Sequence, residues 1–366
     1  MNKYFTPILT CLIFLSVKNF AQGQDTTQHA SFSYSGYVDA YWAIYSDSLG
    51  TDEYQKFATV SPRSNQFGLN VAMLNVKYSS KSIRGTFTLN YGDIPRSSWS
   101  PDYNYIQEAN VGIKLCEKWW IDAGFFRTHI GTEALFPKEN YTSSLAIGTY
   151  FEPLYQAGVK ISYTPTEKLS LCFHVLNGYN LFEDNNRKKS VGLLVTYAFS
   201  DKLNIGYSGY YGDDTPQGDS EKHFRNYHNV FVNYKPGKFK LTAGVDIAMQ
   251  QNSSLSEEDK AGFAMSGLVV GDYKVCDKFD VYARGEIFND DDGILSGVFE
   301  DDNNEFTGLK SWGATLGVQY KPTENSYIKL EGRNLSADSD QKIFYHDKKF
   351  TNNRLEAMIN MGFWFE

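Results

Sequence analysis

Cysteine is scarce in this chain of 366 residues, which contains four. One lies in an apolar stretch near the N-terminus, and Cys116, Cys172 and Cys276 show no spacing typical of a disulfide framework or a metal site. Apolar runs are short as well, because no segment after the N-terminus holds 18 consecutive apolar residues. No helical period is sustained over three turns. These absences exclude a disulfide-rich fold and a bundle of membrane-spanning helices.

Basic residues are in the minority, with 35 Lys and Arg against 43 Asp and Glu and a net charge of −8. A nucleic-acid-binding protein needs a basic surface, so we expect no nucleic acid as a partner. The six histidines lie in no nucleophile motif. We therefore expect no catalytic activity and no cofactor.

The first 23 residues have the features of a secretory signal peptide. Lys3 precedes the apolar stretch "ILTCLIFLSV", and the small residues Ala21 and Gly23 suit cleavage there. We divide the chain into this leader, residues 1–23, and a mature part, residues 24–366, with a net charge of about −10. The alternative is a membrane anchor that stays attached.

Aromatic residues and glycine are abundant, with 26 Tyr, 26 Phe and 30 Gly. Tyr, Phe, Val and Thr favour strands, and segments of about ten residues alternate between apolar and polar positions. Sixteen such segments are predicted to be strands: Phe32–Tyr45, Phe67–Tyr78, Ile83–Tyr91, Glu108–Leu115, Trp119–Phe126, Leu154–Tyr163, Leu169–Asn177, Val191–Phe199, Leu203–Tyr211, Tyr227–Tyr234, Lys238–Ile247, Gly262–Tyr273, Lys278–Phe288, Lys310–Tyr320, Ser326–Arg333 and Arg354–Phe365.

The connections between these segments alternate between short turns and long polar loops. The long ones are 46–66, 92–105, 128–152, 178–189, 212–225, 249–261, 289–309 and 335–352. Short turns at one end, long loops at the other and aromatic residues beside the turns are typical of outer-membrane barrels. Such a sheet must close, because lipid cannot satisfy an open edge. We predict an all-β fold, a transmembrane antiparallel up-and-down barrel of about 16 strands, with 14 to 18 as the range.

A soluble propeller or sandwich is the alternative fold. A propeller repeat of comparable length holds four short strands, whereas each repeat here holds two long ones. A soluble sheet also packs its apolar face inside and leaves polar residues outside. Here aromatic and small apolar residues share one continuous face, as contact with lipid allows. The barrel with short periplasmic turns and long external loops is the better interpretation.

Several stretches resemble one known family when they are read in order. They are "SGYVDAYW" from Ser35, "EANVGIKLCEKWWIDAGFFRTHIGTE" from Glu108, "KENYTSSL" from Lys138, "EPLYQAGVKISYTP" from Glu152 and "FHVLNGY" from Phe173. Together they resemble the β-barrel porin-2 (OmpL-like) family of Gram-negative outer membranes. The resemblance implies a pore-forming barrel, multi-pass in the outer membrane.

Polar residues on the face opposite the apolar one are predicted to line the lumen. They are Asp39, Arg84, Glu108, Lys114, Asp122, Lys160, Lys168, His174, Lys240, Asp246, Arg284, Glu286, Lys329, Glu331, Arg333, Arg354 and Glu356. Charged rings set the selectivity of a pore, and nine basic and seven acidic groups predict weak selectivity. A salt-bridged plug in a closed barrel is the alternative, although barrels of this size normally leave a channel.

The third external loop, residues 128–152, is the longest and least acidic loop. In general porins this loop folds inward and narrows the pore. We name five constriction candidates there: His129, Glu133, Lys138, Glu139 and Tyr141. An ordinary surface loop is the alternative.

The seventh external loop, by contrast, is strongly acidic and reads "NDDDGILSGVFEDDNNE". Crowded carboxylates can bind Ca²⁺ or Mg²⁺, but no EF-hand pattern is present. Weak calcium candidates are Asp290, Asp292, Glu300, Asp301 and Asp302. A solvated acidic loop, or one that bridges through cations to lipopolysaccharide, is the alternative.

The sequence therefore predicts an outer-membrane porin for passive diffusion of small hydrophilic solutes. Its expected partners are these solutes, outer-membrane lipid and lipopolysaccharide, and the barrel-assembly machinery. A homo-oligomer is left open. The alternative function is a non-conducting barrel whose acidic external loops serve adhesion or bind a partner.

Overall fold

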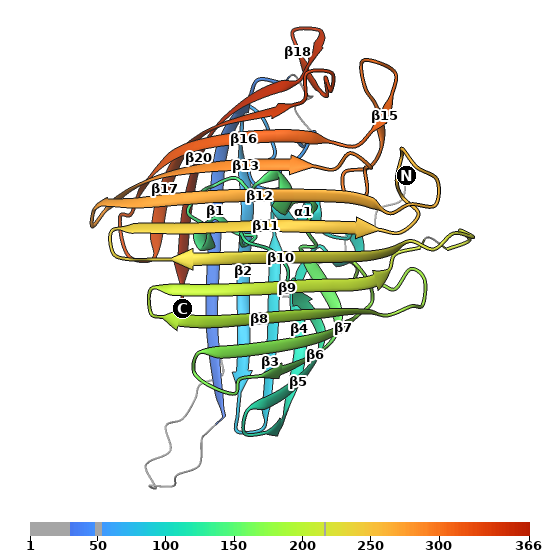
Figure 1. The fold of residues 1–366 in the computed structure, drawn as a ribbon. Coiled ribbons are helices and arrows are strands. Elements are labelled where there is room, and N and C mark those ends of the chain that lie inside the picture. The colour runs from blue at the N-terminus through green and yellow to red at the C-terminus, as the bar shows by residue number, and fades with distance from the viewer. Residues whose placement is uncertain (1–29, 48–52, 216) are drawn as a thin grey trace, which may run out of the picture.

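The computed structural model describes residues 30–47, 53–215 and 217–366. The predicted signal peptide lies outside the described residues. Sixteen antiparallel strands form one closed barrel, in which each strand pairs with its neighbours in the chain and the last pairs with the first (Figure 1). This confirms the predicted fold and strand number.

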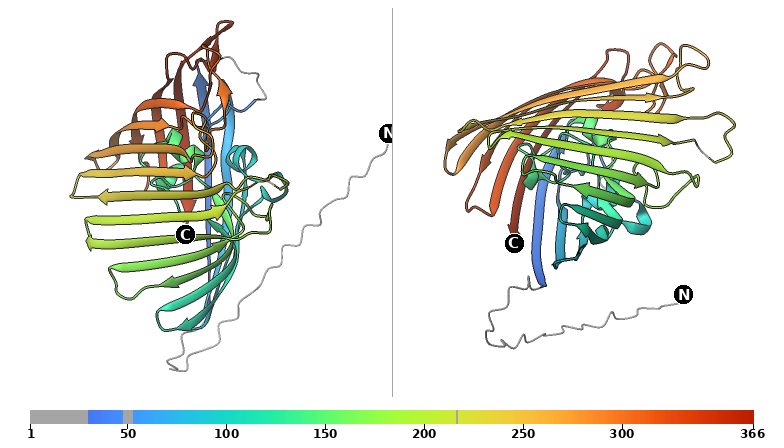
Figure 2. Two further views of the ribbon diagram at one scale, coloured as in Figure 1. Left: turned by 45° about the vertical axis from the view of Figure 1, so that its right-hand side comes forward. Right: turned by 60° about the horizontal axis from the view of Figure 1, so that its bottom comes forward.

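The barrel strands are longer than expected at several ends. Their bounds are β1 Ser31–Tyr45, β2 Gln66–Ser79, β3 Ile83–Tyr91, β4 Ile106–Cys116, β5 Trp119–Arg127, β6 Tyr155–Tyr163, β7 Leu169–Leu176, β8 Ser190–Ser200, β9 Leu203–Asp213, β10 Phe224–Tyr234, β11 Phe239–Gln250, β12 Gly262–Cys276, β13 Phe279–Asn289, β16 Lys310–Tyr320, β17 Ser326–Ala337 and β20 Asn353–Phe365. The short turns gather at one end of the barrel, here called the turn end, and the long connections at the other, the loop end (Figure 2).

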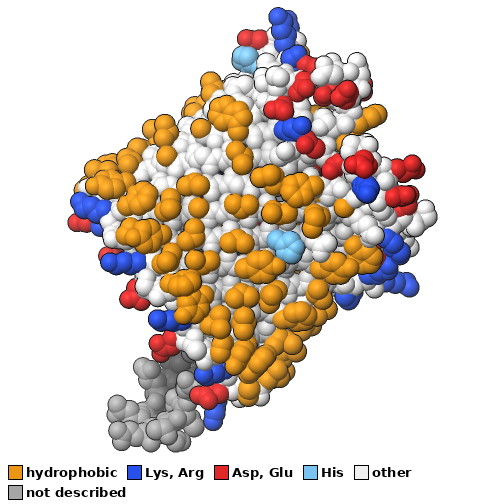
Figure 3. All heavy atoms as spheres, viewed as in Figure 1, with side chains coloured by type: hydrophobic (Ala, Val, Ile, Leu, Met, Phe, Trp, Pro, Cys, Tyr) orange, Lys and Arg blue, Asp and Glu red, His pale blue; other side chains and the backbone are white. Residues whose placement is uncertain are grey.

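Alternation along each strand separates an apolar outer face from a polar inner face. In β13, Phe279, Val281 and Ile287 are exposed, whereas Asp280 and Arg284 are buried. Aromatic pairs such as Trp119 with Tyr163 face outward near the turn end. On the face that Figure 3 shows, hydrophobic side chains cover the middle of the outer surface, with charged residues towards both margins. Such a surface is stable only where lipid covers it.

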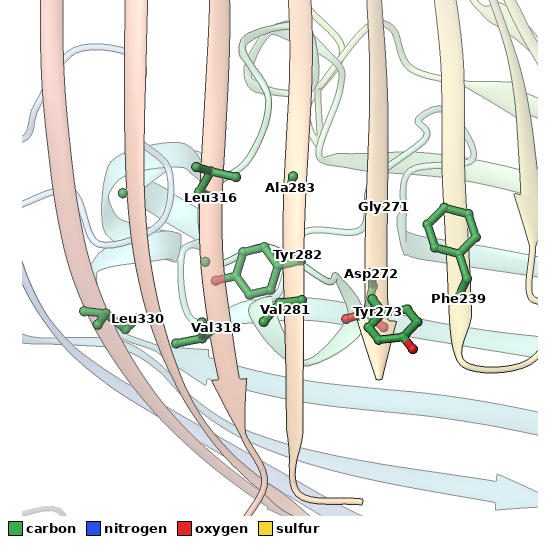
Figure 4. Close-up of a pocket in the computed structure, with 12 residues that line it drawn as sticks. Phe239, Gly271, Asp272, Tyr273, Val281, Tyr282, Ala283, Leu316, Val318 and Leu330 are labelled. Carbon is green, nitrogen blue, oxygen red and sulfur yellow. The ribbon is translucent and has the colours of Figure 1, made fainter. Parts of the chain in front are cut away.

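A shallow hollow of about 740 Å³ lies on this outer face across β11, β12, β13, β16 and β17 (Figure 4). Leu316 and Val318 of β16 and Leu330 of β17 line it, together with the small residues Ala283 and Gly332. Its wall belongs to the lipid-facing band, so it is no part of the lumen. No helix among the described residues is long and apolar enough to cross a membrane.

Several long loops contain short elements that periodicity did not reveal. The second loop holds α1 (Asp93–Ser98) and η1 (Pro101–Tyr103), and the third holds η2 (Pro137–Glu139) and α2 (Ile147–Phe151). Two hairpins, β14–β15 (Phe299–Glu300 and Phe306–Thr307) and β18–β19 (Phe344–His346 and Lys349–Thr351), lie in the last two loops. Segments this short carry too few residues for a detectable period.

Candidate functional site

The third loop, residues 128–154, folds into the barrel and binds the inner wall. Glu331 on β17 accepts hydrogen bonds from the backbone N–H groups of Ser143 (2.6 Å) and Ser144 (3.0 Å). Glu286 on β13 accepts one from the N–H of Ile147 (2.6 Å). Buried carboxylates thus satisfy the backbone of a loop that has no sheet partner of its own.

Basic side chains of the same wall bind the carbonyl oxygens of the loop. Lys329 Nζ donates to the carbonyl oxygens of Pro137 (2.7 Å), Asn140 (2.8 Å) and Thr142 (3.0 Å). Arg284 donates to Ser144 O (2.6 Å) and forms an ion pair with Glu133 (2.9 Å). Each of these cations has most of its donors filled by one loop.

A chain of alternating charges continues from this anchor along the inner wall. Its members, in spatial order, are Glu133, Arg284, Glu286, Arg333, Glu356, Arg354 and Asp47. Neighbouring members form ion pairs of 2.6 to 3.5 Å. All seven side chains are 4% exposed or less. Breaking such a buried chain leaves uncompensated charge, which is costly.

The third loop also packs closely against the wall at two glycines, one on the wall and one on the loop. Gly244 on β11 faces inward, and a Cβ there would lie 1.8 Å from Thr132 Oγ1. A Cβ on Gly148 of the loop would lie 2.4 Å from Ser266 Oγ on β12. Glycine at both positions therefore permits a close approach of loop and wall.

The opposite inner wall, formed by β3 to β10, is less completely filled. Arg84 and Asp122 form a bidentate ion pair there, with the Arg84 side chain 36% exposed. Lys160 lies over the Phe126 ring at 4.6 Å. Glu108 and Lys114 on β4 are also half-buried. The lumen is thus asymmetric, with a packed wall on β12 to β20 and partly exposed polar groups on β3 to β6, whereas β7, β9 and β10 contact the third loop.

The five constriction candidates all lie in the part of the loop that enters the barrel. His129 stacks on His174 of β7, with ring centroids 4.3 Å apart. Glu133 joins the buried charge chain, and Glu139 forms a bidentate ion pair with Arg127 (2.6 and 2.8 Å). Lys138 lies over the Tyr37 ring, and Tyr141 contacts Lys240.

Of the other residues that we expected in the lumen, three lie inside the barrel and one lies at its rim. Asp39 is fully buried among Tyr37, Tyr327, Asn70 and Asn360. Lys240 forms an ion pair with Asp272, and Asp246 is buried beside Asn229 and Ser266. Lys168 lies exposed in the turn between β6 and β7. It is therefore at the rim of the barrel rather than within it.

Two hollows open inside the barrel and share one residue. One, of about 430 Å³, lies at the turn end and is lined by Lys77, Glu108, Glu139 and Glu366, among others. The second, of about 290 Å³, lies between the third loop and β8 to β10. Arg127 lines both. The Arg127–Glu139 ion pair therefore lies at the partition between the two hollows.

The structure does not gather the seventh-loop carboxylates as a metal site. Asp290 accepts hydrogen bonds from the N–H groups of residues 294, 295 and 296 and from the Ser296 hydroxyl. Burial raises the pKa of Asp290, although these hydrogen bonds oppose the rise. Asp292 accepts hydrogen bonds from the N–H groups of Leu255 in the neighbouring loop and Phe263 at the start of β12, and Asp302 pairs with Lys342. Among the described residues, no group of three or more His, Cys, Asp or Glu could hold a metal ion.

Tyrosines on the inner face were missed by the sequence analysis, which placed aromatic residues at the membrane margins. Tyr37, Tyr41 and Tyr45 point inward from β1, and the Tyr282 and Tyr327 hydroxyls donate to Glu331 and Asp39. Their signal was present, since Tyr37 and Tyr41 flank Asp39 at alternate positions of one strand. Buried tyrosine needs a partner for its hydroxyl, and the lumen carboxylates supply it.

This architecture defines a porin-like outer-membrane barrel with an inward-folded loop. The solved structures that it resembles include the outer-membrane channel DcaP of Acinetobacter baumannii, with a TM-score of 0.62 and 13% identity over 91% of this chain and 97% of that one. OmpF of Salmonella typhi, solved as a complex with daunomycin, has a TM-score of 0.62 and 12% identity over 91% and 97%. OmpT of Vibrio cholerae, an outer-membrane protein, has a TM-score of 0.59 and 14% identity over 92% and 98%.

Residues 31–365 match the family described as "Putative beta-barrel porin-2, OmpL-like", and the chain belongs to that family. This confirms the resemblance noted in the sequence and the location in an outer membrane. No curated protein matches the chain. At 12–14% identity, the likeness to these solved structures shows only that the fold is shared.

Proposed function

We propose that the protein is a non-enzymatic channel for passive diffusion of small hydrophilic solutes, narrowed by the third loop. The observation that carries this proposal is the asymmetry of the lumen. The loop is fixed to the wall of β12 to β20 by buried charges, whereas Arg84 on β3 remains partly exposed. His129 at the start of the loop also reaches β7 and β9, so the space that remains for solute lies beside β3 to β5, where Arg84 is 36% exposed. On this proposal the Arg127–Glu139 ion pair, at the partition between the two hollows, is the constriction of that route.

Weak ion selectivity follows from the charges beside this route. The hollow at the turn end is lined by three basic residues, Lys77, Arg127 and Lys138, and three acidic ones, Glu108, Glu139 and Glu366. Opposite signs at similar depth attract both kinds of ion and cancel at a distance. The expected reversal potential in a salt gradient is therefore small.

A closed barrel that binds a partner through its external loops is the second candidate. The buried charge chain favours it, because paired Arg and Glu side chains occupy the interior beside β13, β17 and β20. The acidic loops would then supply the contact surface. Conductance separates the two candidates, since a closed barrel gives no current.

The partition between the hollows predicts the effect of one substitution. Arg127→Ala removes the guanidinium that lines both hollows and releases Glu139. We expect a single-channel conductance higher than that of the parent by a factor of about two, with a shift towards cations because one positive charge is lost. The measurement is single-channel recording in a planar bilayer with a salt gradient.

Arg96→Ala, in the exposed last turn of α1, is the matched control and should leave the conductance unchanged. If Arg127→Ala also leaves conductance and reversal potential unchanged, the route does not pass this ion pair.

A further inference from the structure

One carboxylate in the inner hollow lacks the partners that its burial requires. Glu152, at the end of α2, is 4% exposed, and its Oε1 has no hydrogen-bond partner among the described residues. Thr149 is 2% exposed, and its hydroxyl is equally unpartnered. Both residues line the hollow of about 290 Å³. Buried polar atoms of this kind indicate a missing partner.

A second acidic side chain, Asp246, lies close to Glu152. The Glu152 carboxyl group is within hydrogen-bonding reach of the Asp246 carboxyl group on β11. Two adjacent carboxylates either share one proton, so that only one is ionised, or are both ionised with a cation beside them. Glu133 has Arg284 as its ion-pair partner, but in the described part of the chain neither Glu152 nor Asp246 has one.

The other residues that line the hollow indicate whether the cation is a metal ion or an organic ion. Leu135, Leu154, Leu194 and Phe231 contribute apolar surface to the same hollow. A hydrated metal ion gains nothing from such surface, and the described residues offer no metal-binding group of three ligands. A primary ammonium group, by contrast, has three donors that suit carboxylate and hydroxyl oxygens.

We propose that this hollow is a binding site for a small organic cation, a primary ammonium ion with a short apolar body. Its ammonium group binds Glu152 and the Thr149 hydroxyl, and its body packs on the leucines and Phe231. The site deepens the proposed function by naming a class of solute that the channel retains on its way. Binding is measured without current, so its failure is distinct from failure of the channel.

The test is isothermal titration calorimetry of the refolded chain in uncharged detergent with n-butylammonium chloride. We expect saturable binding of one ion per chain. Glu152→Gln keeps the shape of the side chain but removes its charge, and should weaken binding at least about tenfold, because charge-assisted hydrogen bonds are the strong ones. Thr149→Val should weaken it by a smaller factor. Glu258→Gln, in an exposed external loop, is the matched control and should bind as the parent does.

Three further ligands decide what the site recognises. Sodium butyrate and 1-butanol have the same body with a negative charge or none, and neither should bind measurably. Binding of either as tightly as butylammonium would show a merely apolar hollow and overturn the proposal. Binding of calcium chloride without butylammonium would also overturn it, in favour of a metal site. If no cation binds to the folded parent, a shared proton joins Glu152 and Asp246, and the proposal is wrong whatever the conductance shows.

Discussion

Arg284→Ala is expected to lower the free energy of unfolding by about 3–5 kcal/mol, the usual cost of removing one partner from a buried charge group. The guanidinium is fully buried and links Glu133 of the third loop to Glu286 of the wall. Its loss leaves Glu133 without an ion-pair partner and removes two bonds to Ser144. Urea titration of the barrel refolded in lipid vesicles, followed by tryptophan fluorescence, measures the change.

Two comparisons test whether buried charge is the cause of that loss. Arg96→Ala removes the same side chain from an exposed site and should change stability by no more than about 0.5 kcal/mol. Adding Glu133→Gln to Arg284→Ala neutralises the orphaned carboxylate and should restore part of the loss, since neighbouring sites are not additive. If the double variant is less stable than the single one, the buried charge chain is not what holds the third loop to the wall.

Leu316→Arg is expected to cost about 2–4 kcal/mol of stability in a bilayer, the range for Arg near the midplane of a lipid-facing strand. Leu316 is 69% exposed on the outer face, midway along β16, between Ala283 and Gly332 of the neighbouring strands (Figure 4). Lipid there cannot solvate a guanidinium. Urea titration in vesicles again gives the free energy.

The control places the same new charge outside the lipid. Val298→Arg lies in the seventh external loop at 48% exposure and should change stability little. Equal stabilities of the Leu316→Arg and Val298→Arg variants in vesicles would contradict the assignment of the apolar band to lipid.

The strands were predictable from sequence because lipid and lumen impose opposite demands on alternate residues. Phe279 and Asp280 of β13 show the rule at its simplest, one facing out and the other in. The rule is interrupted in places, as in β2, where Asn70 and Val71 are both buried at a bulge in the pairing with β1, but sixteen local patterns sufficed for the topology. Strand ends were less certain, and Leu335 of β17 continues a strand that we ended at Arg333.

The interior of the barrel was less predictable, because it depends on contacts between distant parts of the chain. The position of the third loop suggested a constriction, but nothing local indicates that Ser143 binds Glu331, which lies 188 positions away. Likewise, Glu152 reads as an ordinary loop acid until the fold places it beside Asp246. The acidic run of the seventh loop misled for the same reason, since backbone N–H groups occupy Asp290.

Single-channel recording of the refolded barrel in a planar bilayer under a salt gradient tests the central claim most directly. An open route beside the third loop predicts stable current steps and a small reversal potential. A strong reversal potential would contradict the mixed charges assigned to the route. Absence of steps from protein shown to be folded would contradict the channel itself and favour the closed, partner-binding barrel.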